Sequence, residues 1–65
     1  MTLHQHPEHR IVTAHIEPAV AHLTFATETG MQRFIADNRR EIRTQFVRWD
    51  VDFYPILTIT AAKAA

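Results

Sequence analysis

The apolar positions of this chain change their period near its centre. Across residues 29–46 they recur at the i, i+3, i+4 spacing of a one-sided amphipathic helix. Thr29, with Gln32 three positions later, fits a capping box at the start of the helix. Glu28 places a negative charge near the positive end of the helix dipole. We expect a helix that begins at Thr29 and ends between positions 43 and 46. Its buried face would comprise Met31, Phe34, Ile35, Ile42 and Phe46.

Before this helix, two runs alternate apolar with polar residues, which is the period of a half-buried strand. The runs are residues 9–16 and 19–26, and Glu17 followed by Pro18 is a turn signal between them. If they pair as a hairpin about this turn, the two residue numbers of each facing pair add up to 37. This register matches Val12 with Phe25, Thr13 with Thr24, Ala14 with Leu23 and His15 with His22.

A helix that starts at Pro18 is the competing interpretation of the second run. The threonine, valine and phenylalanine residues of that run favour a strand, and Gly30 weighs against a long helix. We therefore expect the hairpin and keep the helix as the alternative.

After the central helix, residues 47–54 alternate strictly and predict the clearest strand of the chain. Trp49 lies in the middle of its apolar side, so we expect the indole to be the largest buried side chain. Pro55 interrupts the pattern, and residues 56–60 resume it as a fourth strand. Leu57 and Ile59 share one face of that strand.

These elements predict an α+β fold of order ββαββ: a four-stranded, mainly antiparallel sheet with the amphipathic helix packed on one face. The pattern leaves the order of strands in the sheet open. Residues 1–8 are polar and aperiodic, which predicts a flexible N-terminal arm. Residues 9–61 would form the single domain, and residues 62–65 a frayed tail.

A chain of 65 residues buries only about 60% of its unfolded surface, so its core is small. It contains no cysteine, so disulfides cannot add stability, and a reducing cytoplasm is the natural compartment. We expect a homodimer, or a place in a larger assembly, to supply further burial. No apolar run approaches the 18 to 20 residues of a membrane span, so we expect a soluble cytoplasmic protein without a membrane partner.

Charge is balanced over the whole chain but not along it. The chain has seven Lys or Arg and seven Asp or Glu residues, so its formal net charge is zero. This balance argues against a protein dedicated to binding nucleic-acid phosphates. Residues 31–48 nevertheless carry five arginines against two acids. On the expected helix, four of them would form one continuous basic sector, comprising Arg33, Arg39, Arg40 and Arg43.

Histidine is used five times, and three of these residues, His4, His6 and His9, lie at or beside the N-terminal arm. Imidazoles bind transition metals, but nothing in the pattern fixes a coordination geometry, so no metal site is predicted. His15 and His22 face each other in the expected hairpin. Two imidazolium ions in that position repel, so the pair is a candidate pH-sensitive element, although two solvated polar residues are the simpler interpretation.

No arrangement typical of an enzyme is present. Asp50 and Asp52 share a strand face, but paired carboxylates need a cleft that separates their pKa values, and a single sheet with one helix predicts none. The only glycine, Gly30, lies at the start of the helix rather than in a phosphate-binding loop. Asn38 is the one polar residue near the centre of the helix's apolar face, where it would contact a strand or a dimer seam.

The sequence therefore favours a small non-catalytic protein-interaction module, a regulator, inhibitor or adaptor, without a cofactor. Its partner would be a protein with an acidic surface. The alternative is a nucleic-acid-binding protein that uses the same arginines on phosphates. The residues expected to contact a partner are Arg33, Arg39, Arg40, Arg43, Arg48 and Tyr54.

Overall fold

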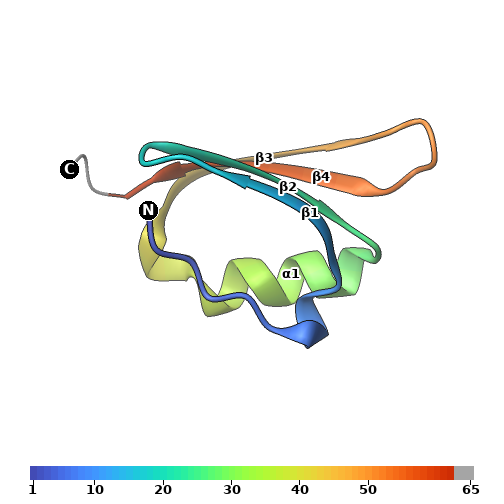
Figure 1. Ribbon diagram of the computed structural model, residues 1–65, viewed down its shortest axis with the longest axis horizontal. Coiled ribbons are helices and arrows are strands. Elements are labelled where there is room, and N and C mark those ends of the chain that lie inside the picture. The colour runs from blue at the N-terminus through green and yellow to red at the C-terminus, as the bar shows by residue number, and fades with distance from the viewer. Residues whose placement is uncertain (63–65) are drawn as a thin grey trace.

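The computed structural model describes residues 1–62 (Figure 1). A four-stranded antiparallel sheet and one α-helix follow each other in the order ββαββ, so the predicted α+β fold is confirmed. Of the predicted tail, residues 63–65 lie outside the described residues. The strands are β1 (Ile11–Ile16), β2 (Val20–Phe25), β3 (Ile42–Trp49) and β4 (Pro55–Ala61); the helices are α1 (Glu28–Asp37) and the short 3₁₀ helices η1 (Pro7–His9) and η2 (Arg39–Glu41).

The strands lie in the order β1-β2-β4-β3, so β2 and β4 are central and join the two hairpins. The predicted register of the first hairpin is confirmed from Thr13 onward, and His15 faces His22. The prediction for Val12 is wrong, because a bulge next to it makes Ile11 the residue that faces Phe25.

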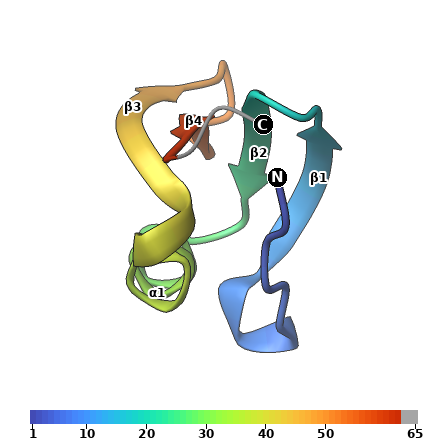
Figure 2. The ribbon, with the colours of Figure 1, turned by 90° about the vertical axis from the view of Figure 1, so that its left-hand side faces the viewer.

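The core lies between the sheet and α1. The alternation of β2 and β4 puts every second side chain on the covered face, and α1 contributes Met31 and Phe34 from its apolar side. The rings of Phe25 and Phe34 are 5.3 Å apart. In the end-on view of Figure 2, α1 lies on the β3 side of the molecule and η1 on the β1 side. The buried apolar residues are Ala21, Leu23, Phe25, Met31, Phe34, Leu57 and Ile59.

The predicted length of the helix is wrong, because α1 ends at Asp37, six or more residues earlier than expected. Asn38 caps it, with its main-chain N–H donating to Phe34 O (3.0 Å) and Ile35 O (3.3 Å). The chain then turns through η2 and pairs with β4. Ile42 and Phe46 therefore belong to a strand, and Phe46 is 65% exposed on the uncovered face.

The start of α1 also differs from the prediction. Thr27, not Thr29, is the N-cap, and its hydroxyl accepts a hydrogen bond from the Gly30 N–H at 3.0 Å. The expected capping box of Thr29 and Gln32 is therefore wrong. The N-cap two residues earlier places Gly30 in the first turn of α1, where it is buried.

The strand predicted over residues 47–54 is wrong beyond Trp49, where β3 ends in a tight turn. The Asp50 carboxylate accepts hydrogen bonds from the N–H groups of Asp52 (2.8 Å) and Tyr54 (3.0 Å), which closes the turn locally. Phe53 adopts a left-handed conformation with φ of 64°. The predicted burial of Trp49 is also wrong: it lies on the edge strand and is 53% exposed.

Candidate interaction surfaces

The turn between β3 and β4 carries large apolar side chains in solvent. Val51 is 92% exposed, Phe53 82% and Tyr54 41%. Because Asp50 fixes the main chain around them, these side chains are held outward by the turn rather than by a core. Figure 1 shows the turn extending beyond the end of α1. We refer to residues 50–54 as the hairpin tip.

The arginines do not form the helical sector that was predicted, because the helix ends before most of them. Arg33 lies on α1, and its Nε is 3.4 Å from Glu8 Oε2. Arg39 and Arg40 belong to η2, and Arg43 lies at the start of β3. All are exposed, as is Arg48 on β3. We call Arg39, Arg40 and Arg43 the arginine end, which lies at the opposite end of β3 from the hairpin tip.

A hollow of about 330 Å³ lies beside the arginine end, between α1 and β3. Ile35 and Ile42 give it apolar, half-buried side chains, and Arg39 and Arg43 give it positive charge. Its size is at the lower end of the range for small-ligand sites. We call it the α1–β3 hollow; its remaining lining residues are Gln32 and Gln45.

The sheet face opposite α1 has no covering element within residues 1–62. A row of cross-strand neighbours crosses it, namely His15, His22, Thr58 and Phe46. His15 Nε2 is 3.2 Å from Glu17 Oε2, and His22 Nδ1 is 3.1 Å from Thr58 Oγ1. The two imidazoles are thus neighbours, as predicted, and each also has a polar partner of its own. Their pH sensitivity stays a prediction.

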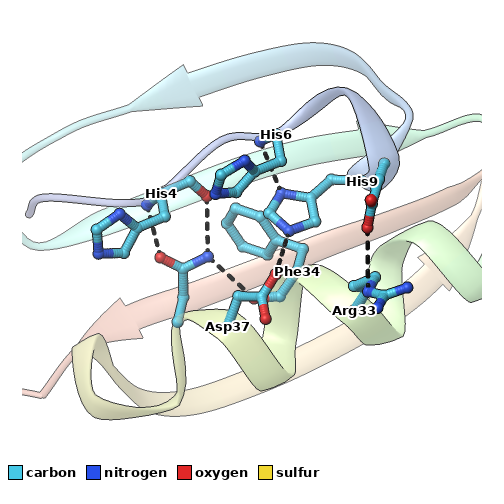
Figure 3. Close-up of polar contacts among 8 residues, drawn as sticks. His4, His6, His9, Arg33, Phe34 and Asp37 are labelled. Atoms are coloured by element: carbon cyan, nitrogen blue, oxygen red, sulfur yellow. Dashed lines mark hydrogen bonds and ion pairs between the residues drawn. The ribbon is translucent and has the colours of Figure 1, made fainter.

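The N-terminal segment, predicted as a flexible arm, follows a defined path against α1 (Figure 3). His9 is completely buried, and its ring packs edge-on against Phe34 at 5.3 Å. His9 Nδ1 accepts a hydrogen bond from the His6 N–H (3.1 Å), so the ring proton resides on Nε2 and is donated to Asp37 Oδ2 (2.7 Å). Both ring nitrogens are occupied, which leaves His9 no lone pair for general-base chemistry.

Asn38 fastens the same segment at a second point. Its Oδ1 accepts from the His4 N–H (2.7 Å), and its Nδ2 donates to His4 O (3.0 Å) and to Phe34 O (2.9 Å). Asn38 is buried, and its partners are the N-terminal segment and its own helix. The predicted contact of Asn38 with a strand or a dimer seam is therefore wrong.

The hydrogen bond between His9 and Asp37 predicts that the stability of the fold depends on pH in the acid range. The hydrogen bond from His9 lowers the pKa of Asp37 below its usual value, and the charge of Arg33 adds to this effect. A carboxylate with a lowered folded-state pKa stabilises the fold above its unfolded pKa of about 3.9, and this contribution disappears as the pH falls further.

We expect Asp37→Asn to remove part of the loss of stability below about pH 4. Urea unfolding of the wild type and the variant at pH 7 and pH 3 measures this difference. Asp52→Asn, at an exposed position of the hairpin tip, is the control and should leave the difference unchanged. Equal acid sensitivity of wild type and D37N would contradict the role given to Asp37.

Within residues 1–62, no group of three His, Asp or Glu side chains is placed to hold a metal ion. In the same residues, no helix has the length and apolar character needed to cross a membrane. The Asp50 carboxylate, considered above for paired-acid chemistry, is used in the turn of the hairpin tip.

The hairpin tip was not predicted, because apolar and polar residues alternate through it as they do in a strand. The signal that marks it is Asp50, since aspartate is depleted in strands and its carboxylate readily accepts main-chain hydrogen bonds two residues on. No protein-family model, curated protein or solved structure matches this chain.

Proposed function

We propose that this chain is a small non-catalytic protein-interaction module, a regulator, inhibitor or adaptor, that binds a protein partner through its hairpin tip. The observation that carries the proposal is the exposure of Val51 and Phe53 on a turn closed by hydrogen bonds to the Asp50 carboxylate. Exposed apolar groups on a preorganised turn lose little conformational entropy on binding. Aromatic residues such as Phe53 are enriched in the buried core of protein interfaces.

The arginine end supports a second contact with the same partner. Arg39, Arg40 and Arg43 are exposed, and they would meet the acidic surface expected of the partner. Arg33 contributes less, because Glu8 already lies beside it. The occupied ring nitrogens of His9 support the non-catalytic part of the proposal. A cytoplasmic location remains part of it.

Replacing Val51 and Phe53 together by serine tests the proposal. Both side chains are exposed, so the variant should fold normally, and partner affinity should fall at least about ten-fold because the central apolar contacts are lost. The measurement is affinity capture from lysate of the source cells, followed by titration of each captured protein, purified, against wild type and variant. Val12→Ser, which changes an exposed residue outside the hairpin tip, is the matched control.

A partner whose purified form binds wild type and V12S but not the double variant supports the proposal. Equal binding to all three variants, or no partner at all, contradicts it. Labelled single- and double-stranded nucleic acids at low salt form a further arm of the experiment. Binding there that weakens in Arg39→Ala and Arg43→Ala would favour the nucleic-acid alternative, which the grouping of three arginines at one end still supports.

A further inference from the structure

We infer that β3 forms the interface of a symmetric dimer, in which its free edge pairs antiparallel with the same edge of a second copy. The inference deepens the proposed function, because it names a second copy of the chain as one protein partner. It rests on the proposed function for what the dimer does. The arginine end contributes to both proposals, but Trp49 and Val47 differ from Val51 and Phe53, so variants at these residues test the two proposals separately. Three observations carry it: the orientation of the β3 main chain, the position of Trp49 and the charges at the two ends of β3.

The main chain of β3 has one side that no strand of residues 1–62 covers. The Asp50 N–H donates to Tyr54 O at 3.1 Å across the β3–β4 hairpin. In an antiparallel pair, residues hydrogen-bonded to the partner strand alternate with residues whose main-chain groups point the other way. From Thr44 to Arg48, after the bulge, the main-chain N–H and C=O groups of the even-numbered residues therefore point toward β4. The residues that present N–H and C=O groups at the free edge are Gln45, Val47 and Trp49.

If a two-fold axis passes beside Val47, all of these main-chain N–H and C=O groups form hydrogen bonds with the second copy. Val47 then faces Val47 of the second copy, and Trp49 faces Gln45 of the second copy in both directions. The axis is perpendicular to the sheet, so both α1 helices stay on one face and the two sheets become continuous. A free edge of this kind is a template for strand pairing.

Trp49 is placed to use this pairing. It lies on the α1 side of the sheet, because its neighbour Pro55 is buried there, yet it is 53% exposed in the single chain. Gln45 lies on the same side and lines the α1–β3 hollow. Opposite Gln45 of the second copy, the indole would enter that copy's hollow of about 330 Å³ and cover Ile35 and Ile42.

The charges of β3 are complementary in this arrangement. Asp50 and Asp52 come directly after β3. Arg39 and Arg40 come before β3, and Arg43 is its second residue. Antiparallel pairing therefore brings the acidic end of each copy beside the basic end of the other, which favours association. On the uncovered face, Arg48 of each copy faces the exposed ring of Phe46 of the other, as in a cation–π pair.

The other edge strand is less suited to this role. Both edge strands have a bulge near their start, and the regular part that follows is shorter in β1 (residues 13–16) than in β3 (residues 44–49), so β3 offers the longer regular edge for strand pairing. The interface is therefore assigned to β3.

Sedimentation equilibrium of the full chain at tens to hundreds of micromolar tests the dimer. Wild type should be dimeric, and Trp49→Ser should raise the dimer dissociation constant at least about ten-fold, because the indole leaves the hollow. The matched control is Phe53→Ser, which removes another exposed aromatic ring from the same hairpin and should leave the dimer intact. Circular dichroism checks that each variant is folded.

Single cysteines test the register, since the chain has none of its own. Val47→Cys should form a disulfide-linked dimer under mild oxidation, because facing residues of an antiparallel pair lie within disulfide reach. Phe46→Cys and Val12→Cys should crosslink more slowly. A monomeric wild type, equal dimerisation of W49S and wild type, or faster crosslinking of F46C or V12C than of V47C would overturn the inference. Loss of the partner in the V51S/F53S variant with an intact dimer would bear on the proposed function alone.

Discussion

Replacing Gly30 by alanine is expected to destabilise the fold by about 2 kcal/mol or more, although alanine is the better helix former by about 1 kcal/mol. An added Cβ would lie 2.2 Å from the His9 carbonyl oxygen and 2.8 Å from its carbon. These are main-chain atoms of η1, so no side-chain rotation can make room. The first turn of α1 or the N-terminal segment must move, which disturbs the buried His9 ring.

The unfolding free energy of G30A from urea titration measures this effect. A domain of this length is expected to be stable by only about 3 to 10 kcal/mol, so the loss is a large fraction of the total. Ala36→Gly, at an exposed position of the same helix, is the control for intrinsic helix propensity and should cost about 1 kcal/mol. A G30A variant more stable than wild type would show that η1 does not pack on Gly30.

The order of elements was predictable because β2 and β4 are central strands with one buried face. Alternation around Leu23 and around Leu57 and Ile59 reports that burial directly, and the turn at Pro18 sets the register of the first hairpin. The strand order was not predictable, since it depends on which edges of the two hairpins pair. That choice is made by tertiary packing against α1, and no local pattern encodes it.

The end of α1 was misjudged because two patterns overlap after Asn38. Ile42 and Phe46 are four residues apart, a spacing that fits the continued face of a helix. The bulge between Ile42 and Thr44 shifts the alternation of β3, so Ile42 and Phe46 lie on opposite faces of the sheet. Hydrogen bonding with β4 makes residues 42–49 a strand although their apolar spacing also fits a helix. The positions of the arginines change as a result. Arg39 and Arg43 flank a hollow instead of extending a helical stripe.

The candidate surfaces were predictable only in part for a related reason. Tyr54 and the arginines are polar or amphipathic, so their exposure follows from residue type. Trp49, Val51 and Phe53 are apolar, and residue type alone predicts that they are buried. Their exposure depends on where α1 stops covering the sheet and on the turn closed by Asp50. A small core with one short helix leaves such residues for contacts between molecules.

Replacing Asn38 is expected to be the most damaging polar substitution. Asn38→Ala should cost about 2 to 3 kcal/mol, because the His4 N–H and C=O groups lose their partner in a partly buried place and the buried Phe34 O loses its side-chain donor. Asn38→Asp should cost more at pH 7, at about 3 to 5 kcal/mol. Its carboxylate would face the carbonyl oxygens of His4 and Phe34, now 3.0 and 2.9 Å from the amide nitrogen, without a proton to share.

The pH dependence separates this effect from a simple loss of packing. Burial beside two carbonyl oxygens raises the folded-state pKa of the new carboxyl group, so the N38D penalty should shrink as the pH falls and the group gains a proton. N38A has no such group and should show no such recovery. Gln32→Glu, an amide-to-acid change on the exposed side of α1, is the control and should cost little at any pH. Unfolding free energies at pH 7 and pH 4 decide the matter, and an N38D variant within about 0.5 kcal/mol of wild type at pH 7 would mean that Asn38 does not hold the N-terminal segment.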